Sequence, residues 1–368
     1  MADVWAYRLT PRRAFHFGVR GVGVEASAVT AASDLLFGAL CQGLRATAGW
    51  DTAERGLARL LDACEARQPP FLVSSLFPFA GAVRLLPRPL QPLGGAGAAG
   101  GGKDWRKVAY LSWGRWGALY GAPAGVAPPA FDREDLLQGR QAWVTAAERE
   151  ALAVFRDPED PVGAIRLWQE GDSPRVTIDR RTSESQVYQA GWVAFPPGAG
   201  LYFLMEWRDP AWQPAIHAAL AYLAEEGIGG ERSSGYGQFT LAIDAPVPLP
   251  APPTSPAPAA MTLSLYHPTA PEVVEAGLLA AGAYGLTTRR GWVGAPGALG
   301  VRRRDVLMLT EGSVLPFQGA GPFGNMVDVT PETWPPGVRE VPGRLRRYGF
   351  ALPLPLPAAP EEVPDAPH

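Results

Sequence analysis

The stretch Gly227–Phe239 reads GIGGERSSGYGQF and places five glycines within eleven residues. Residues 212–223, which precede it, repeat large apolar side chains at helical spacing, and Gly227 is suited to end that helix in the left-handed conformation. Apolar and polar residues then alternate from 236 to 243, which is typical of a half-buried strand. The stretch is therefore predicted as a loop between a helix and a strand.

The chemistry of this loop suits a sugar–phosphate chain. Glycines expose backbone N–H groups that no Cβ shields, while Arg232, Ser233 and Ser234 add one cation and two hydroxyls. An alternative interpretation stays open for an isolated loop of this kind: a glycine-rich turn that packs only against its own domain.

Better-known glycine loops do not fit the spacing. The interval from Gly230 to Gly235 is that of a P-loop, but Tyr236 stands where the phosphate-binding lysine is needed. A dinucleotide-binding motif that starts at Gly227 would require glycine in place of Arg232. A polymerase or cyclase palm needs paired carboxylates to hold two metal ions, and one glutamate followed by a cation does not supply them.

The loop resembles the glycine-rich motif of the RAMP superfamily, the ferredoxin-like RNA-binding subunits of CRISPR systems. Further motifs along most of the chain resemble one branch, the fourth subunits of the type III-A Csm effector complex, which bind the 5′ tag of the crRNA. These motifs are Phe15–Gly18, Ser33–Leu40, Arg175–Thr182 with Tyr188 after it, and Tyr348–Pro353.

The resemblance implies a non-catalytic subunit at the base of the complex. Its implied partners are the repeat-derived 5′ tag of the crRNA, the large polymerase/cyclase-like subunit and the backbone RAMP subunits, and its implied role lies in antiviral defence. No cofactor or metal is expected, nor binding of DNA by the chain alone. The sequence agrees with a non-catalytic subunit that holds no metal, because no nucleophile–base pair, metal-ligand spacing or paired carboxylates are evident in it.

Composition moderates the expected strength of RNA binding. The formal net charge is −3 and the pI is about 5.9, so the chain lacks the overall basic character of many nucleic-acid-binding domains. Weak binding of RNA by the chain alone is therefore expected. The N-terminus has no signal-peptide pattern and no apolar run approaches the length of a membrane span, which predicts a cytoplasmic protein that does not contact membranes.

The predicted fold class is α+β, with two ferredoxin-like (RRM-like) domains. Residues 1–244 form the first, with an insertion at about 87–172 that is partly flexible and whose tryptophans form a small satellite core. Residues 245–260 hold seven prolines in sixteen positions and are predicted as a semi-rigid linker, able to span roughly 40–50 Å. Residues 261–356 form the second domain, with a helix from Thr269 to Gly282, and 357–368 a disordered tail.

The candidate RNA-binding residues are cations, hydroxyls, loop glycines and aromatic rings that can stack on unpaired bases. They are Arg12, His16, Arg180, Arg181, Thr182, Tyr188, Gly229, Gly230, Arg232, Ser233, Ser234, Gly235 and Tyr236. On spacing alone, the group 180–182 is also compatible with a solvated turn that pairs with neighbouring acids.

Arginines also gather in the second half of the chain. Arg289, Arg290 and Arg302–Arg304 are its densest positive charge and are predicted on loops. They suit contact with RNA or with an acidic face of a partner, and they suit equally a cluster that only keeps the surface soluble.

Two other functions remain open at this point. His16 is the one plausible general base, so a metal-independent endoribonuclease that processes CRISPR transcripts is an alternative, although no partner acid is evident. A packed core histidine between Phe15 and Phe17 is the competing interpretation of His16. A protein–protein adaptor, and the equivalent subunit of a type III-B complex, are further alternatives.

Overall fold

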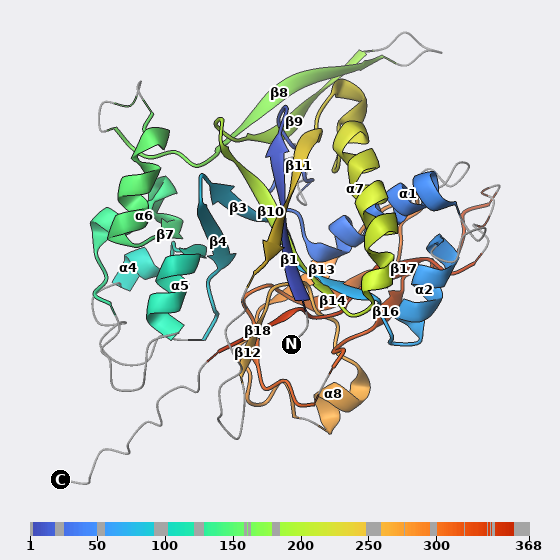
Figure 1. Ribbon diagram of the computed structural model, residues 1–368. Helices are drawn as coiled ribbons and strands as arrows, with labels where there is room; N and C mark the ends of the chain where they lie inside the picture. The colour runs from blue at the N-terminus through green and yellow to red at the C-terminus, as the bar shows by residue number, and fades with distance from the viewer. Residues whose placement is uncertain are drawn as a thin grey trace.

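The structure is a computed structural model, shown in Figure 1. It describes residues 3–18, 26–49, 56–91, 102–120, 129–157, 160, 163–178, 185–247, 259–275, 277–294, 300–319, 321–336, 338, 340 and 343–356. The predictions for Arg180, Arg181 and Thr182, for most of the proline-rich linker and for the tail 357–368 therefore lie outside the described residues.

A mixed sheet forms the centre of the first half. Its strands at this point are β11 (Phe239–Pro246), β1 (Asp3–Pro11), β10 (Ala199–Trp207), β2 (Phe71–Val73) and β3 (Phe77–Ala80). They run in the order β11-β1-β10, and both β2 and β3 pair with β10. With one helix after β1 and another after β10, this order is that of a split βαβ unit. The predicted α+β class is confirmed.

Two long helices pack on one face of this sheet, as Figure 1 shows for α1 (Ser33–Ala48) and α7 (Gln213–Glu226). The α1 stripe of Leu36, Leu40 and Leu44 is buried as its periodicity predicts. A third helix, α2 (Leu57–Glu65), follows α1. Strand β10 pairs with β1 on one edge and with β2 and β3 on the other, nearly all its residues are buried, and its sequence is almost continuously apolar. Among the described residues, no helix is both long and apolar enough to cross a membrane.

The insertion continues the main sheet. Beyond β3 the sheet is extended by β4 (Val83–Pro87), β5 (Tyr110–Ser112), β7 (Ala142–Trp143) and β6 (Leu136–Leu137), in that order. The helices of this region are α4 (Gly102–Trp105), α5 (Trp113–Tyr120) and α6 (Ala146–Ala151), with the short 3-10 helices η1 (Arg133–Asp135), η2 (Gln138–Arg140) and η3 (Leu152–Phe155). Trp116 and Trp143 belong to the same hydrophobic core as β1 and β10. The predicted satellite core is therefore wrong, because the shared sheet carries one core through both parts.

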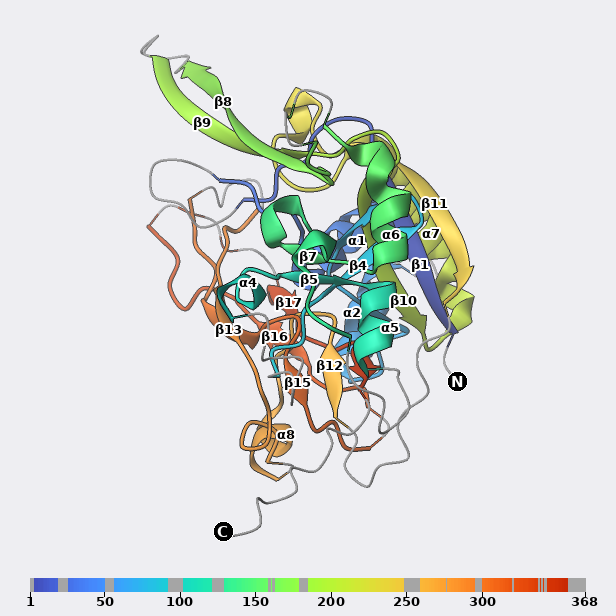
Figure 2. The ribbon, with the colours of Figure 1, turned by 90° about the vertical axis from the view of Figure 1, so that its left-hand side faces the viewer.

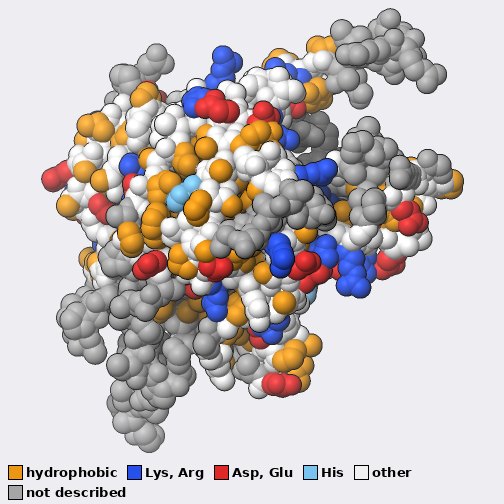
Figure 3. Space-filling view, turned by 45° about the vertical axis from the view of Figure 1, so that its right-hand side comes forward, with side chains coloured by type: hydrophobic (Ala, Val, Ile, Leu, Met, Phe, Trp, Pro, Cys, Tyr) orange, Lys and Arg blue, Asp and Glu red, His pale blue; other side chains and the backbone are white. Residues whose placement is uncertain are grey.

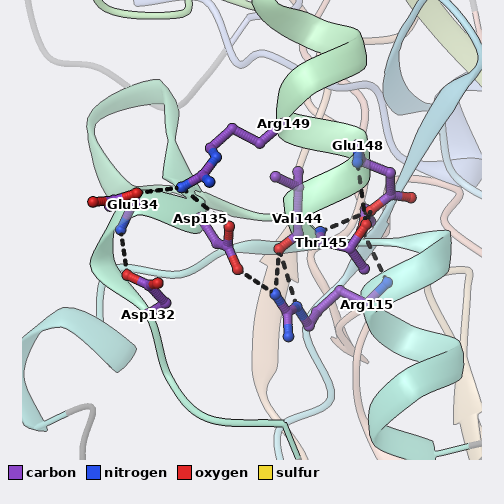
Figure 4. Close-up of polar contacts among 9 residues, drawn as sticks. Arg115, Asp132, Glu134, Asp135, Val144, Thr145, Glu148 and Arg149 are labelled. Atoms are coloured by element: carbon purple, nitrogen blue, oxygen red, sulfur yellow. Dashed lines mark hydrogen bonds and ion pairs between the residues drawn. The ribbon is translucent and has the colours of Figure 1, made fainter.

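A buried ion pair fixes the insertion (Figure 4). Arg115 is 5% exposed and donates to Asp135 at 2.6 Å and to the Val144 carbonyl at 2.7 Å, and its guanidinium lies 4.6 Å from the centre of the Trp143 ring. Glu148 on α6 makes a second link, because its carboxylate accepts hydrogen bonds from the Thr145 N–H at 2.9 Å and from the Ser112 hydroxyl at the end of β5. Charges that are buried and paired in this way hold α5 against the loop before α6.

A long hairpin projects from the body. Its strands are β8 (Gln169–Ile178) and β9 (Ser185–Ala194), which pair in register along their whole length, and both ribbon views show them extending beyond the other elements (Figures 1 and 2). Trp192 lies across the position that a Cβ of its cross-strand neighbour Gly171 would occupy. This glycine therefore lets an aromatic ring cover the base of the hairpin.

The second half consists of small sheets. Its elements are β12 (Ala260–Thr262), β15 (Val314–Leu315) and β18 (Pro353–Pro355) in one sheet, the pairs β13 (Leu286–Arg289) with β14 (Val306–Leu309) and β16 (Met326–Asp328) with β17 (Arg346–Tyr348), and α8 (Ala270–Val274). The helix predicted from Thr269 to Gly282 is wrong in length. Thr269 does supply a capping box, but α8 ends after five residues, and Gly282 packs against Leu315.

The two halves share one hydrophobic core. Phe37 on α1 stacks on Tyr348 with ring centroids 4.6 Å apart, and the Tyr348 hydroxyl accepts from the Val73 N–H at 3.2 Å. The Ser33 hydroxyl accepts from the Leu265 N–H at 3.0 Å. Burial of apolar surface and these cross-half hydrogen bonds therefore fix the second half on α1 and β2.

One buried carboxylate fastens this contact. Asp34, in the first turn of α1, accepts two hydrogen bonds from Arg289 on β13, at 2.8 and 3.0 Å, and a further one from Arg347 on β17. Its side chain is 2% exposed. Arg289 therefore lies on a strand and pairs with an internal acid, which corrects its prediction as a loop residue that faces RNA, an acidic partner or solvent.

We expect Asp34→Asn to lower the free energy of unfolding by about 3–5 kcal/mol, because it leaves two arginines partly or wholly buried without their carboxylate. Urea unfolding of the full chain measures this. The matched control is Asp62→Asn on α2, the same chemical change at an exposed position, which should shift stability by less than about 0.5 kcal/mol. Equal midpoints for the two variants would contradict the role of Asp34.

Candidate RNA-binding site

Three segments that are distant in the sequence meet at the base of the projecting hairpin. The Ala14 carbonyl accepts from the Gly237 N–H at 3.0 Å, and the His16 carbonyl accepts from the Gly230 N–H at 2.9 Å. On its other side, Phe15 exchanges two 2.9 Å hydrogen bonds with Val193 of β9. Residues 14–16 therefore join the glycine loop to the hairpin in the manner of a short strand between two neighbours.

His16 lies inside this junction. It is 5% exposed, and its Nδ1 is 2.6 Å from the carbonyl oxygen of Gly191 on β9. Because a carbonyl oxygen only accepts hydrogen bonds, Nδ1 carries a proton. The imidazole therefore ties the N-terminal segment to the hairpin, as a packed core histidine does.

The loop glycines are required by this packing. Gly229 has φ +89°, and a Cβ on it would collide with the His16 carbonyl oxygen. A Cβ on Gly230 would lie 2.6 Å from Cδ2 of the imidazole. Both positions therefore exclude a side chain, because the backbone of the loop approaches His16 too closely.

The backbone N–H groups of the loop glycines were predicted to be exposed donors for a phosphate, but three of them donate to carbonyl groups of the protein itself. The N–H of Gly230 donates to His16, that of Gly235 donates to the Arg232 carbonyl at 2.9 Å, and that of Gly237 donates to Ala14. The prediction of exposed amide donors for a phosphate is therefore wrong at these three positions. For the glycines, the alternative of a turn packed against its own domain describes the structure.

The polar tip of the loop faces solvent. Arg232, Ser233 and Ser234 form the single turn η5 (Arg232–Ser234) and are all exposed. Glu231 before it takes a left-handed conformation with φ 54°, and its carbonyl accepts from the Ser234 N–H at 2.9 Å. The cation and the two hydroxyls remain together at the surface, as the sequence predicts.

A cation and an aromatic ring join the loop to the hairpin. The Arg175 guanidinium lies 5.4 Å from the centre of the Tyr236 ring, and Tyr188 is the cross-strand neighbour of Arg175. The Nε of Arg175 is buried and has no hydrogen-bond partner among the described residues. Arg175 was missing from the predicted site residues, although pairing β8 with β9 in register places it opposite Tyr188.

Arg12 is already paired. Its guanidinium makes two 2.7 Å hydrogen bonds to the Glu225 carboxylate at the end of α7, and both side chains are exposed. These hydrogen bonds hold the pKa of the Glu225 carboxyl below its ordinary value. RNA binding by Arg12 stays a prediction, and in this structure the exposed Glu225 carboxylate competes for its guanidinium.

Most of the predicted residues thus come together. Arg12, His16, Tyr188 and the whole loop gather around one junction, while Arg180, Arg181 and Thr182 belong to residues 179–184, outside the described part of the chain. The surface of this junction offers arginines, hydroxyls and aromatic rings. Such groups bind phosphates and stack on unpaired bases of single-stranded RNA.

Comparison with known proteins supports one family. Residues 255–356 match the family model of the CRISPR Csm4 C-terminal domain. The chain is 28% identical over 308 residues to the CRISPR system protein Csm4 of Mycobacterium tuberculosis, an alignment that covers 83% of this chain and 86% of the relative. Csm4 of Thermococcus onnurineus is 26% identical over 300 residues, which cover 77% of this chain and 81% of the relative.

Solved structures share the fold. The crystal structure of a Csm3–Csm4 subcomplex of the type III-A CRISPR–Cas interference complex contains a chain that matches with a TM-score of 0.66 at 17% identity, over 97% of this chain and 100% of that one. A Csm1–Csm4 cassette in complex with cA4 matches with a TM-score of 0.52 at 19% identity, over 98% and 99%.

In its fold and its glycine-rich loop, the chain resembles subunits of the RAMP superfamily. Within it, the family model, the curated relatives and the shared fold agree on one member family. Together these findings support a RAMP subunit of the Csm4 kind.

We expect Gly229→Ala to lower the free energy of unfolding by about 2 kcal/mol or more, because its Cβ meets a backbone oxygen at a positive φ. The matched control is Gly38→Ala within α1, where a Cβ would meet no atom within 4 Å. That change should be neutral or stabilising by about 0.5–1 kcal/mol. Chemical denaturation compares the variants, and a Gly229→Ala protein as stable as the control would contradict this packing.

Proposed function

We propose that the chain is a non-catalytic, cytoplasmic RNA-binding subunit of a type III-A CRISPR interference complex. In this proposal it binds and positions the 5′ repeat tag of the crRNA and docks the large polymerase/cyclase-like subunit at the base of the complex. The observation that carries the proposal is the junction of three segments, which holds Arg232, Ser233 and Ser234 exposed beside the stacked Arg175 and Tyr236.

The chemistry of that surface favours a single strand over a duplex. Hydroxyls and arginines bind phosphates in any sequence, and the Tyr236 ring with Arg175 provides a planar, positively charged platform on which an unpaired base can stack. The proposed tag is single-stranded, so its bases are free to stack in this way.

The distribution of charge over the surface favours a modest affinity of the chain alone for RNA. Figure 3 shows Lys and Arg side chains beside Asp and Glu on the visible face, with many hydrophobic and neutral ones between them, and no broad basic field. With a net charge of −3, attraction over long distances is weak. Binding therefore rests on a few local contacts, which a complex with partner subunits would extend.

The burial of His16 supports the non-catalytic part of the proposal. A general base must reach the 2′-hydroxyl of an RNA, whereas this imidazole is 5% exposed and one of its nitrogens is engaged with the Gly191 carbonyl. A positioning role fits this geometry better than proton transfer. We also propose two ferredoxin-like domains as the underlying frame, the second one reduced to small sheets and a single short helix.

The proposed partners are those of the related proteins. Csm4 chains occur with Csm3 in one solved structure and with Csm1, a large subunit, in another, and this chain shares their fold over nearly its whole length. The sequence relatives support the same assignment across most of the chain. We therefore extend both partners to this chain.

We expect a labelled RNA with the repeat-derived 5′ tag to bind the chain and its large partner without being cleaved. Arg232→Glu should weaken binding and, if one phosphate contact is lost, lower the slope of log affinity against log salt by about 0.7. The control Arg59→Glu makes the same charge change at an exposed position on α2, far from the hairpin in Figure 1. Tag-independent binding, or cleavage that His16→Ala abolishes, would overturn the proposal.

We expect Glu225→Gln to strengthen binding of the same RNA, because it releases Arg12 from its carboxylate partner and removes one negative charge near the loop. The salt slope should become steeper by about 0.7 if Arg12 then contacts a phosphate. Fluorescence anisotropy at two or more salt concentrations measures both quantities. The double variant Arg12→Gln with Glu225→Gln should lose the gain, and an equal gain in both variants would exclude Arg12 as its source.

A further inference from the structure

Three arginines surround the one buried carboxylate that joins the two halves. Arg289 on β13 and Arg347 on β17 both donate to Asp34. Arg303, on the segment between β13 and β14, belongs to the same cluster, because Asp34 and Arg347 both act electrostatically on its guanidinium. Within the described ranges, no carboxylate forms an ion pair with Arg303. The cluster therefore carries more positive charge than Asp34 neutralises.

Arg303 and Arg347 lie beside the same space, next to Gly291. The Arg303 N–H donates to the Gly291 carbonyl at 2.9 Å. A Cβ on Gly291 would lie 3.6 Å from Nη2 of Arg347 and 4.0 Å from Cδ of Arg303, and it would meet no other described atom within 4 Å. Gly291 is partly exposed, so this space is open to solvent. We call it the Gly291 space.

Both guanidinium groups keep a donor that the protein does not satisfy. Arg347 is 7% exposed, and its Nη1 and Nη2 donate to Asp34 and to the Arg290 carbonyl. Its Nε is buried and has no hydrogen-bond partner among the described residues, and the same holds for the Nε of Arg303. A buried donor without an acceptor is costly, above all when it is charged.

The two like charges also oppose each other. Burial and the neighbouring Arg347 lower the pKa of the Arg303 guanidinium, so its charged form is less stable here than in water. A bound anion would supply acceptors for the Nε donors and would relieve this repulsion. The Gly291 space thus has the donors and the charge of an anion site.

Other acids near this cluster do not supply that charge. Asp305 forms an ion pair with Arg290 at 2.5 Å. Glu311 interacts with Asp34, but its carboxylate accepts from the Ser75 hydroxyl, and burial raises the pKa of Glu311, which disfavours its charged form. The missing negative charge therefore has to come from outside the cluster.

A phosphate group suits this space better than a carboxylate does. It carries up to two negative charges near neutral pH, which matches the excess of two cations over the single Asp34 carboxylate. Its oxygens point in several directions, so one group can accept from two arginines that belong to different strands. A carboxylate has one charge and two oxygens in a single plane.

We propose that the Gly291 space is a phosphate-binding site, in which Arg303 and Arg347 donate to the phosphate oxygens and Asp34 holds Arg347 in place. This inference goes beyond the proposed function, because the site requires neither the repeat-derived tag nor a partner subunit. The phosphate is either inorganic phosphate or a backbone phosphate of an RNA strand, and the experiment distinguishes these two sources.

The test titrates the purified full chain with sodium phosphate by isothermal calorimetry, at constant ionic strength set with sodium chloride. We expect the wild type to bind one phosphate per chain and Arg303→Gln to bind it at least tenfold more weakly, because that variant lacks one cation and leaves the Asp34 ion pairs intact. The matched control is Arg302→Gln. Arg302 is exposed and lies 4.9 Å from the centre of the Trp292 ring, so its loss should leave phosphate affinity unchanged.

Thermal melting shows that the variants are folded and gives a second measurement. In phosphate-free buffer, Arg303→Gln should melt at the wild-type temperature or above it, because the substitution removes the repulsion with Arg347. Phosphate should then raise the melting temperature of the wild type more than that of Arg303→Gln. General stabilisation by phosphate acts on both proteins and cancels in this comparison.

No binding of phosphate by the wild type, or equal affinity in Arg303→Gln, would overturn the inference. An equal loss in Arg302→Gln and Arg303→Gln would also overturn it, because general charge would then explain the binding. Once phosphate binding is shown, weaker binding of labelled RNA by Arg303→Gln, with competition by inorganic phosphate, assigns the site to an RNA phosphate. Unchanged RNA affinity assigns it to free phosphate. A wild type that binds phosphate but not the tagged RNA would refute the proposed function and leave this inference intact.

Discussion

The Asp34 carboxylate is the contact on which the arrangement of the two halves depends. It is nearly inaccessible to water, and it is stabilised there because Arg289 and Arg347 satisfy its oxygens from two separate strands. Burial and the nearby Arg347 also lower the pKa of the Arg303 guanidinium. A buried charge cluster of this kind adds little net stability compared with apolar packing, but it tolerates only one arrangement of its partners. It therefore sets where β13 and β17 lie against α1.

The candidate RNA-binding site depends on a second close contact, that of the loop backbone with His16. Because Gly229 and Gly230 allow the loop to approach the His16 backbone and ring, the N-terminal segment is held between the loop and β9. Arg232, Ser233 and Ser234 are left exposed as a consequence. The glycines thus act on function through packing and position, and the exposed side chains supply the chemistry.

One surface of the chain has the chemistry of the proposed RNA-binding function. The junction at the hairpin base presents hydroxyls, arginines and an aromatic ring, which suit an RNA strand. The junction is held by the buried His16 and its contacts with the loop and with β9, so its surface is presented in a fixed geometry.

The sequence by itself determined the local elements: the stripe of α1, the helix before the glycine loop, the strand after it and the exposure of Arg232, because periodicity and turn chemistry act over a few residues. Only the tertiary structure decided the partners of the polar groups. Arg12 meets Glu225, Arg289 meets Asp34, and the Gly230 amide meets His16, each across more than two hundred residues. No local pattern encodes such a pairing, since several acids and carbonyls would serve equally well until the packed core brings one of them within reach.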